Sequence, residues 1–356
     1  MSEENFYSRQ TTLKEIGLKG QKKLKLQKVL IVGAGGLGHP VATYLAAAGI
    51  GEICIIDFDR IEESNLNRQV CFTINNLGKE KATTLAGKIQ LQNPYIKVEG
   101  LVEKLAPHNA KEIIDPFDMI LDCSDNLATK FLLHDFAWSL KKDLIQASIY
   151  QYEGQIQSFN FSKNNNRGCL RCLWPKIPTN NCVQNCQEAG VIGAVAGALG
   201  NIQALEAVKL LLGLGKNFND TTITVDLLTL EIQKIKWTKN NSCPLCSLNK
   251  SIDEIRKDHN IKCNSFELTT LDQRDFVLVD IREEDEIRQK EFHQSYSFIN
   301  LPFSKAECWF DQIDTNKKYL FICERGLRSA FLVKKMRTKN MLNCFSLSQG
   351  LASVRS

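Results

Sequence analysis

The sequence predicts an α/β protein in which antiparallel strands close a doubly wound sheet and a second, smaller α/β domain follows. Three observations support this fold class. The apolar run KVLIVG, the glycine-rich stretch GAGGLGHP (33–40) and the apolar VATYLAAAGI indicate a strand, a turn and a helix in succession. The next apolar run, EICIIDFD (52–59), completes a strand–helix–strand unit, which is typical of a parallel sheet. After a charged stretch the pattern restarts at FVLVDIR (276–282), where we expect the second domain.

The remaining elements of the first domain continue this alternation. The expected helices are KEKATTLAGKIQLQNP (79–94) and ATKFLLHDFAWSLKK (128–142), and the expected strands are IKVEGLVEKL (96–105), FDMILDC (117–123), DLIQASIY (143–150) and GQIQSFNFS (154–162). The stretch TTITVDLLTLEIQKIKW (221–237) alternates like an antiparallel pair that closes the sheet. We therefore expect one domain at 1–248, a charged linker at 249–264 and a second domain at 265–356.

Composition excludes several classes of protein. The chain has 356 residues with a net charge of +5, and its basic residues are scattered among acidic ones, so we expect no direct nucleic-acid binding. Polar residues interrupt the longest apolar stretch (191–215), and the N-terminus lacks a signal pattern. We therefore expect a cytoplasmic protein that does not span a membrane. Thirteen cysteines are many for such a protein, and they suggest a metal site or thiol chemistry.

The glycine-rich turn taken alone favours a dinucleotide site. Gly33, Gly35 and Gly38 satisfy the G-x-G-x-x-G pattern of a Rossmann-like turn, and Asp57 ends the next strand, where a ribose-binding acid is expected. By this test a nicotinamide oxidoreductase would be the first hypothesis. Such an enzyme would also need a site that accepts hydride.

The residues downstream favour ATP instead. Asp59 and the stretch SNLNRQ (64–69) follow Asp57 closely, and an arginine with two asparagines suits the charge that develops on an attacked phosphate. Lys81 adds a second cation. Asp125 and Asn126 follow a strand end, where a carboxylate can hold Mg²⁺.

Each of these residues taken alone has a simpler explanation. Lys81 could be a solvated helix residue, Arg68 a surface ion-pair partner and Asp125 a helix cap. Their combination in this order favours an ATP site.

At these motifs the chain closely resembles the sulfur-carrier adenylyltransferases MoeB and ThiF, which are relatives of ubiquitin-activating enzymes. The resemblance covers about residues 5–248. The matching motifs are YSRQ (7–10), GAGGLG (33–38), DFD with SNLNRQ (57–69), GKEKA (78–82), LDCSDN (121–126) and CQEAGVIG (186–193).

The resemblance implies a role for each of these positions. Asp57 would bind the ribose of ATP, and Asp125 would ligate Mg²⁺ with support from Asn126. Arg9 would reach into the ATP site of a partner subunit, which makes a homodimer necessary. Lys130 and His39 stand where relatives usually have arginine and cysteine. The full nucleotide-binding set would be Gly33, Gly35, Gly36, Gly38, Asp57, Asp59, Ser64, Asn65, Leu66, Asn67, Arg68, Lys81, Asp125 and Asn126.

Cysteine spacing predicts a metal site. Two C-x-x-C pairs, Cys169 with Cys172 and Cys243 with Cys246, supply four thiolates for a tetrahedral structural Zn²⁺. Buried thiols or a redox pair are the alternatives, and the family resemblance also implies zinc. Cys186, at the end of a long polar stretch (174–190), matches the position that can bond to the activated carrier or its sulfur. Cys182 is the weaker candidate.

The second domain contains a loop suited to an anionic sulfur. CERGLRS (323–329) lies between an expected strand and an expected helix, where backbone N–H groups and two arginines can stabilise a cysteine persulfide. About residues 265–356 resemble rhodaneses, through the loop pattern C-x-x-G-x-R and the strand VLVDIREEDEI (277–287). The loop comprises Cys323, Glu324, Arg325, Gly326, Leu327 and Arg328. The middle of the domain departs from the rhodanese pattern, and Ser329 stands where a phosphatase loop would need arginine.

Together the resemblances imply a two-step enzyme. The first domain would adenylate the C-terminal glycine of a ubiquitin-like (β-grasp) sulfur carrier that ends in Gly-Gly. A Cys323 persulfide, loaded by a donor such as a cysteine desulfurase, would then supply sulfur for the thiocarboxylate. Molybdopterin cofactor biosynthesis is the favoured pathway, with thiamine biosynthesis and tRNA thiolation as alternatives. A nicotinamide oxidoreductase and a non-catalytic scaffold that binds a carrier are the remaining hypotheses.

Overall fold

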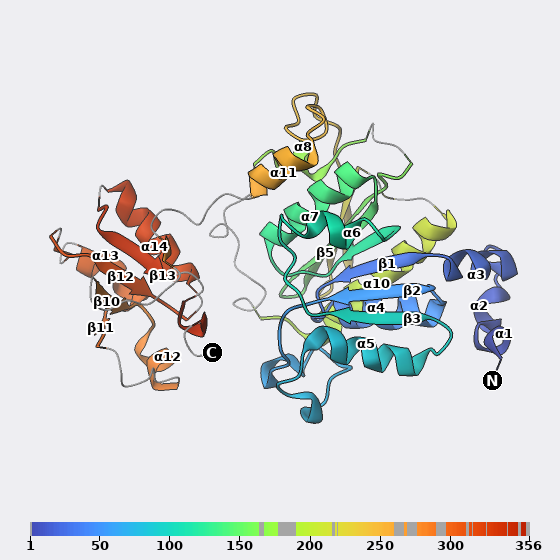
Figure 1. Ribbon diagram of the computed structural model, residues 1–356, viewed down its shortest axis with the longest axis horizontal. Coiled ribbons are helices and arrows are strands. Elements are labelled where there is room, and N and C mark those ends of the chain that lie inside the picture. The colour runs from blue at the N-terminus through green and yellow to red at the C-terminus, as the bar shows by residue number, and fades with distance from the viewer. Residues whose placement is uncertain are drawn as a thin grey trace. The chain divides into compact units, whose positions relative to one another are not determined.

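The computed structural model describes residues 2–163, 167–176, 190–215, 218, 220–259, 267–268, 276–289, 297–310, 313–314, 316–324, 326–339, 341–347 and 350–353. The chain separates into two compact units, Met1–Asn260 and Ile261–Ser356 (Figure 1).

The first unit is built on an eight-stranded sheet of order β3-β2-β1-β4-β5-β6-β7-β8. Strands β3 (Lys97–Leu101), β2 (Glu52–Ile56), β1 (Lys28–Val32), β4 (Met119–Asp122) and β5 (Asp143–Tyr150) are parallel neighbours. Strands β6 (Glu153–Phe159), β7 (Thr221–Asp226) and β8 (Glu231–Lys236) continue the sheet in antiparallel fashion. The predicted doubly wound sheet with closing antiparallel strands is confirmed.

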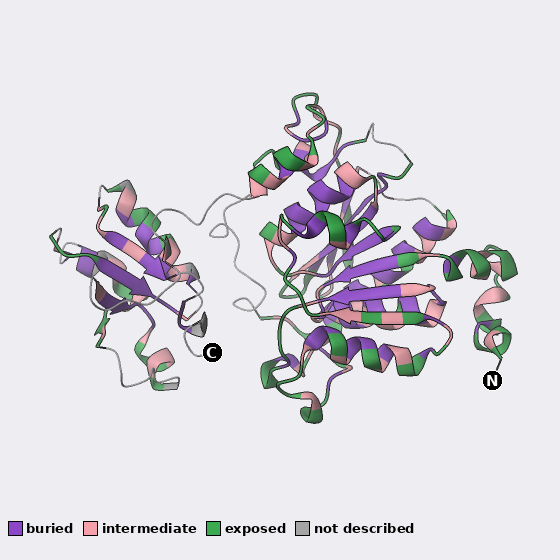
Figure 2. Cartoon of the chain, in the orientation of Figure 1, coloured by how far each residue is buried: buried purple, intermediate pink, exposed green. Residues whose placement is uncertain are grey.

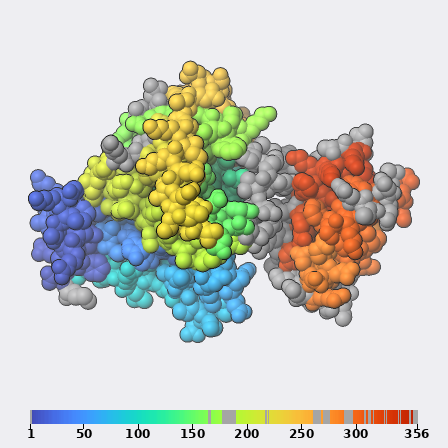
Figure 3. All heavy atoms as spheres, turned by 180° about the vertical axis from the view of Figure 1, so that it is seen from behind, coloured from blue at the N-terminus to red at the C-terminus, as the bar shows by residue number. Residues whose placement is uncertain are grey.

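Helices cover both faces of this sheet because its central strands are apolar on both sides. Along β1, Val29 and Ile31 enter one core cluster and Leu30 and Val32 enter the other. The first cluster packs against α3 (Gly17–Lys25), α4 (Gly38–Ala48), α5 (Lys81–Gln92) and α10 (Gly193–Leu212), and the second packs against α6 (Ala110–Ile114) and α7 (Leu127–Leu140). Figure 2 shows the resulting buried centre of the sheet. Strand β8 differs, since all six of its residues are exposed, and Figure 3 shows the yellow segment that contains it on the surface.

The first unit also contains three short helices. Helices α1 (Glu3–Phe6) and α2 (Ser8–Thr11) precede α3. Helix α8 (Leu170–Leu173) has Cys169 as its N-cap and contains Cys172. Helix α10 is long and apolar enough to cross a membrane by length and composition, but 56% of its apolar window is buried inside the protein. That burial is typical of the central helix of a folded core.

The predicted linker is wrong in part, because it contains a helix that belongs to the first unit. Helix α11 (Ile252–His259) buries Ile255 completely in the second core cluster. His259 Nε2 lies 2.8 Å from Asp135 Oδ2, and Arg256 Nε donates to the Pro107 carbonyl. One buried isoleucine and two polar anchors are enough to fix a segment whose composition is otherwise charged.

The second unit has a five-stranded parallel sheet of order β11-β10-β12-β13-β9. Its strands are β9 (Glu267–Leu268), β10 (Val277–Asp280), β11 (Ile299–Asn300), β12 (Tyr319–Ile322) and β13 (Cys344–Leu347), and its helices are α12 (Glu284–Gln289), α13 (Ala306–Trp309) and α14 (Leu327–Thr338). Phe321 and Ile322 of β12 enter different core clusters, so this central strand is buried on both faces. The expected small α/β domain is present.

We predict that Gly38→Ala destabilises the first unit strongly, because the added Cβ would lie 2.1 Å from the Gly33 carbonyl oxygen. A backbone clash of this kind should cost roughly 2–4 kcal/mol of unfolding free energy. Urea denaturation measures the effect. Gly35→Ala is the matched control, since no atom lies within 4 Å of its added Cβ. Its midpoint should stay near that of the wild type, and an equal loss in both variants would contradict the prediction.

Candidate functional site

The glycine-rich turn lies where the strand order of the first sheet reverses, between β1 and β4. Gly33 adopts φ +103°, and a Cβ at this position would lie 2.8 Å from the Cys123 carbonyl oxygen. The turns that follow β1 and β4 therefore touch through their backbones. Ligands of open α/β sheets bind at this kind of switch point, outside the carboxyl ends of the strands.

Asp57 is fixed against the glycine-rich turn at the end of β2. Its Oδ2 accepts from the Ala34 N–H at 2.8 Å, and its Oδ1 accepts from the Asp59 N–H at 2.8 Å. Burial raises the pKa of Asp57, and the two backbone hydrogen bonds oppose that shift. Each carboxylate oxygen keeps one further lone pair, so the group can accept from a sugar hydroxyl.

The two predicted cations are held in place by the protein. Lys81, whose side chain is 9% exposed, pairs with Asp59 at 2.9 Å. Arg68 Nη1 donates to the Ser64 carbonyl at 2.7 Å and to Asn67 Oδ1 at 3.1 Å. Fixed cations can stabilise a phosphate without first losing side-chain freedom.

The stretch SNLNR joins the glycine-rich turn through Arg68. Its Cγ would lie 3.5 Å from a Cβ placed on Gly36, so the arginine stem covers this glycine. Asn65 and Leu66 have structural roles: the buried Asn65 accepts from the Glu62 N–H, and Leu66 packs on the first core cluster. The structure therefore brings Gly36 and Arg68 together, while Asn65 and Leu66 hold the SNLNR stretch in place.

The turn after β4 presents Asp125 at the surface. Asn126 is the N-cap of α7, because its Oδ1 accepts from the Thr129 N–H at 2.9 Å. The alternative that Asp125 caps this helix is wrong, and its exposed carboxylate has the character of a ligand group. Carboxylate oxygens are ligands that Mg²⁺ prefers.

A buried polar network beneath this turn escaped the sequence interpretation. Asp122 is fully buried, and its Oδ2 accepts from Lys130 Nζ at 3.3 Å and from Gln146 Nε2 at 2.8 Å. Its Oδ1 accepts from the Ser124 N–H at 3.0 Å. Lys130 is therefore a structural partner of Asp122 that fixes the start of the turn. The only sequence signal was the carboxylate that ends a buried strand.

His39 also has a structural environment. Its ring is fully buried beside Phe72, and burial lowers its pKa to about 3, so the ring is neutral. Its Nδ1 accepts from the Cys71 N–H at 3.0 Å. This hydrogen bond ties the first turn of α4 to the chain that follows SNLNRQ.

Arg9 lies away from the turn of its own chain. Tyr7 anchors this region, since its buried hydroxyl accepts from Asn93 Nδ2 at 2.8 Å, and Gln10 donates to the Ala48 carbonyl at the C-terminus of α4. The glycine-rich turn is at the opposite end of this 11-residue helix, roughly 16 Å away. The exposed Arg9 side chain makes no hydrogen bond or ion pair with any residue that the structure describes.

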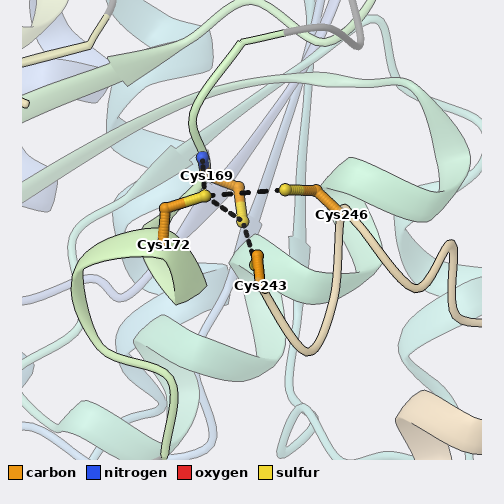
Figure 4. A group of neighbouring side chains, drawn as sticks. All are labelled: Cys169, Cys172, Cys243 and Cys246. Atoms are coloured by element: carbon orange, nitrogen blue, oxygen red, sulfur yellow. Dashed lines mark hydrogen bonds between the residues drawn. The ribbon is translucent and has the colours of Figure 1, made fainter. Parts of the chain in front are cut away.

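The four predicted zinc ligands come together. Cys169 Sγ lies 3.5 Å from Cys243 Sγ, and Cys172 Sγ lies 3.5 Å from Cys246 Sγ. All four sulfurs lie within 4.8 Å of one another, and Figure 4 shows them pointing toward one another. Tetrahedral Zn–S bonds of about 2.3 Å require sulfurs about 3.8 Å apart, so the cluster fits Zn²⁺.

The thiol environment also suits a metal. Hydrogen bonding from Cys169 lowers the pKa of Cys243 to about 4 and that of Cys172 to about 6, and the same hydrogen bonds raise the pKa of Cys169, which keeps its proton when no metal is bound. Thiolates are the form that binds zinc. None of the described cysteines forms a disulfide.

A buried carboxylate supports the cysteine cluster. Asp135 accepts from Arg171 Nη2 at 2.7 Å and contacts His134 and His259, while His134 Nε2 accepts from the Leu170 N–H. Burial alone would raise the pKa of Asp135, but its hydrogen-bond partners hold it below the ordinary range. The ionised carboxylate joins α7, α8 and α11 around the thiols.

The Cys323 loop of the second unit is closed around its sulfur. Cys323 is 1% exposed, although the persulfide hypothesis expects an accessible sulfur. Its Sγ accepts a hydrogen bond from the Ser329 N–H at 3.5 Å. Arg328 donates to both oxygens of Glu286 at 2.6 and 2.8 Å, so its charge is compensated. Gly326 adopts φ +80° and is the N-cap of α14.

Several predicted residues cannot be placed. Cys186, Cys182 and Arg325 lie outside the described residues, and so does the side chain of Leu327. Glu324 is described and contacts Arg282 at 3.4 Å.

Comparison with known proteins identifies relatives. The chain matches the model of the ThiF family over residues 7–245. It is 41% identical over 242 residues to the sulfur carrier protein adenylyltransferase of Thermus thermophilus, a match that covers 67% of this chain and 89% of that protein. It is 34% identical over 362 residues to the adenylyltransferase and sulfurtransferase MOCS3 of Drosophila grimshawi, covering 94% of this chain and 79% of that protein.

Solved structures confirm the fold of the first unit. The crystal structure of E. coli MccB with ATP is 22% identical, with a TM-score of 0.60 over 68% of this chain and 75% of that chain. Similarity at this identity concerns the fold alone, which is the Rossmann-like α/β arrangement that the sequence predicts.

We predict that the purified chain carries close to one equivalent of zinc, measured by elemental analysis. Cys243→Ser should lose most of it and lower the melting temperature, because a structural metal contributes its binding free energy to folding. Cys54→Ser is the control, since this buried thiol stands apart from the four-sulfur cluster. Full zinc content in Cys243→Ser would contradict the assignment.

Proposed function

This chain belongs to the ThiF family, and we propose that it activates the C-terminal glycine of a ubiquitin-like sulfur carrier with ATP and then converts it to a thiocarboxylate. The expected enzyme class, an adenylyltransferase and sulfurtransferase, is confirmed by relatives that carry these names and match 67% and 94% of this chain. One observation supports the nucleotide step most directly: the glycine-rich turn, Arg68 and Asp57 meet at the switch point of the sheet.

The adenylation step follows from the charges at that point. Asp57 would accept from the ribose hydroxyls, and the backbone of the glycine-rich turn would approach the phosphates. The carboxylate of the carrier attacks the α-phosphorus, the bond to the β-phosphate oxygen breaks, and pyrophosphate leaves. Arg68 and Lys81 would balance the charge that builds up on the phosphates in this step. Mg²⁺, for which Asp125 is the proposed ligand, would neutralise the departing pyrophosphate when bound.

We propose a homodimer in which Arg9 completes the ATP site of the partner subunit. The support is geometric, because Arg9 lies at the far end of α4 from its own glycine-rich turn and is exposed. An arginine supplied from the other subunit would add positive charge only in the assembled enzyme.

Sulfur transfer is assigned to Cys323. Its thiolate attacks the outer sulfur of a donor such as thiosulfate or a desulfurase persulfide. The donor S–S bond breaks, its electron pair leaves on sulfite or on the donor thiolate, and Cys323 carries –S–S⁻. The terminal sulfur of this persulfide attacks the glycine carbonyl and AMP leaves, so that Cys323 and the carrier are joined by an acyl disulfide. A second thiolate then attacks Cys323 Sγ, the S–S bond breaks and its electron pair leaves on the thiocarboxylate, and an external thiol reduces the remaining disulfide. Cys186 is the thiol that we propose to assist the transfer.

The pathway rests on the identity of the carrier. We favour a carrier for molybdopterin biosynthesis in the cytoplasm, with carriers for thiamine biosynthesis or tRNA thiolation as alternatives. A mixture of this protein, ATP and single candidate carriers ending in Gly-Gly distinguishes them, because only the true carrier should gain the mass of an adenylate and then of a thiocarboxylate. A nicotinamide oxidoreductase would show none of these products.

We predict that Asp125→Ala lowers carrier-dependent exchange of pyrophosphate into ATP by roughly 100-fold or more. Asp125→Asn should lose nearly as much, because the amide keeps the shape and removes the charge. Asp118→Asn is the control for loss of a carboxylate elsewhere, since Asp118 accepts from the Lys28 N–H at the base of β1. Full exchange in both Asp125 variants would overturn the metal assignment.

The same assay tests the dimer. Arg9→Ala and Asp125→Ala should each be inactive alone, yet mixed subunits should regain about a quarter of the wild-type sites, since half of the dimers are hybrids with one intact site. Absence of recovery after subunit exchange would contradict a contribution from the partner.

We further predict that thiosulfate or a loaded cysteine desulfurase adds one sulfur atom to Cys323, seen by peptide mass spectrometry. Cys323→Ser should abolish this addition and thiocarboxylate formation while pyrophosphate exchange persists. Cys344→Ser, which removes another buried thiol of the same unit, is the control. No added sulfur with either donor would count against the sulfur-transfer step.

A further inference from the structure

Among the residues that the structure describes, Ser329 of α14 makes two hydrogen-bond contacts with Cys323 Sγ. The amide of Ser329 is the third in this helix, so it has no acceptor within the helix, and it donates to Cys323 Sγ at 3.5 Å. The Ser329 hydroxyl also lies 3.5 Å from the same sulfur. Both Ser329 and Cys323 are buried from solvent.

The Ser329 hydroxyl belongs to a short chain of hydrogen bonds. It donates to the Gly326 carbonyl at 3.0 Å and accepts from the hydroxyl of Ser346, on β13, at 2.9 Å. Ser346 is fully buried. Because Ser346 supplies the incoming proton, the proton of Ser329 is available for either of two acceptors, the Gly326 carbonyl or the Cys323 sulfur.

Arg328 and Arg282, two described arginines of this region, are each paired with carboxylates. Arg328 is held by Glu286 through two hydrogen bonds. Arg282 is held by Asp280 at 2.7 Å and by Glu324 at 3.4 Å. These carboxylates offset much of the charge of the two arginines, so hydrogen bonds from Ser329 can contribute to stabilising an anionic sulfur at Cys323. A hydrogen bond to a charged group is stronger than one between neutral groups.

We propose that Ser329 is a catalytic residue whose hydroxyl turns from the Gly326 carbonyl to the Cys323 sulfur when that sulfur is anionic, and that Ser346 is the positioning residue that orients it. This assignment rests on the proposed sulfur-transfer function. It applies to the thiolate before it attacks the donor sulfur and to the thiolate restored after the outer sulfur has been passed on. In the neutral thiol the Ser329 hydroxyl donates to the Gly326 carbonyl. When the thiolate forms, the thiol proton leaves to solvent, and Ser329 keeps its own proton in both states.

The experiment measures the pH profile of Cys323 alkylation by iodoacetamide in the full chain, with the Cys323 peptide quantified by mass spectrometry. Ser329→Ala should raise the midpoint of the profile by about one pH unit and slow alkylation about tenfold below it. Ser346→Ala should slow alkylation less, by about threefold. Ser304→Ala is the matched control, because its hydroxyl donates to Glu283 at the surface, and its profile should equal that of the wild type.

The outcomes separate this assignment from the proposed function. A wild-type profile in Ser329→Ala overturns the assignment. If Ser329→Ala unfolds the second unit, Ser346→Ala decides, since it leaves Ser329 in place, and an unchanged profile then overturns the assignment. Alkylation needs no sulfur donor, so a wild-type Cys323 that accepts no sulfur contradicts the proposed function and leaves the profile test intact.

Discussion

The close contact between the turns after β1 and β4 is the constraint on which the first unit depends. Gly33 can approach the Cys123 carbonyl only because it lacks a side chain and adopts a positive φ. That contact places the start of α4 beside the turn that carries Asp125, and the Ala34 N–H brings Asp57 to the same point. Three strand ends therefore converge on one small region, and each contributes a different group.

A second constraint holds the far edge of this unit together. Ionised Asp135 is bonded by its neighbour His134, by Arg171 and by His259. Arg171 lies between the first two cysteines of the four-sulfur cluster, and His259 follows the second pair. A buried carboxylate is tolerated only where its charge is compensated. Arg171 supplies that compensation, and it lies between Cys169 and Cys172, so the carboxylate is fixed beside the cysteine cluster. Helix α11 is fixed to this arrangement through His259.

The sequence predicts the fold and the grouping of four cysteines where the signal is local. Apolar runs identify the central strands, and paired C-x-x-C spacing identifies four thiols that do meet. Sequence patterns predict the structure less well where contacts between distant residues determine it. Helix α11 depends on one buried isoleucine within a charged segment. The cap of α7 is Asn126 and not Asp125, because the backbone geometry of one residue selects it. Lys130 pairs with a carboxylate that looked like an ordinary strand residue.

The two proposed sites solve different electrostatic problems. ATP carries several negative charges, and the first unit offers Arg68, which donates to the uncharged oxygens of Ser64 and Asn67, together with Lys81, which is paired with Asp59. A cysteine thiolate carries one charge, and the second unit pairs Arg328 and Arg282 with carboxylates. A full positive charge beside the sulfur would make the thiolate a weaker nucleophile, because nucleophilicity falls as the thiol becomes more acidic. Hydrogen bonds from Ser329 would stabilise the Cys323 thiolate less than an unpaired arginine would. The proposed transfer needs this balance, because Cys323 must both take a sulfur atom from a donor and pass it on.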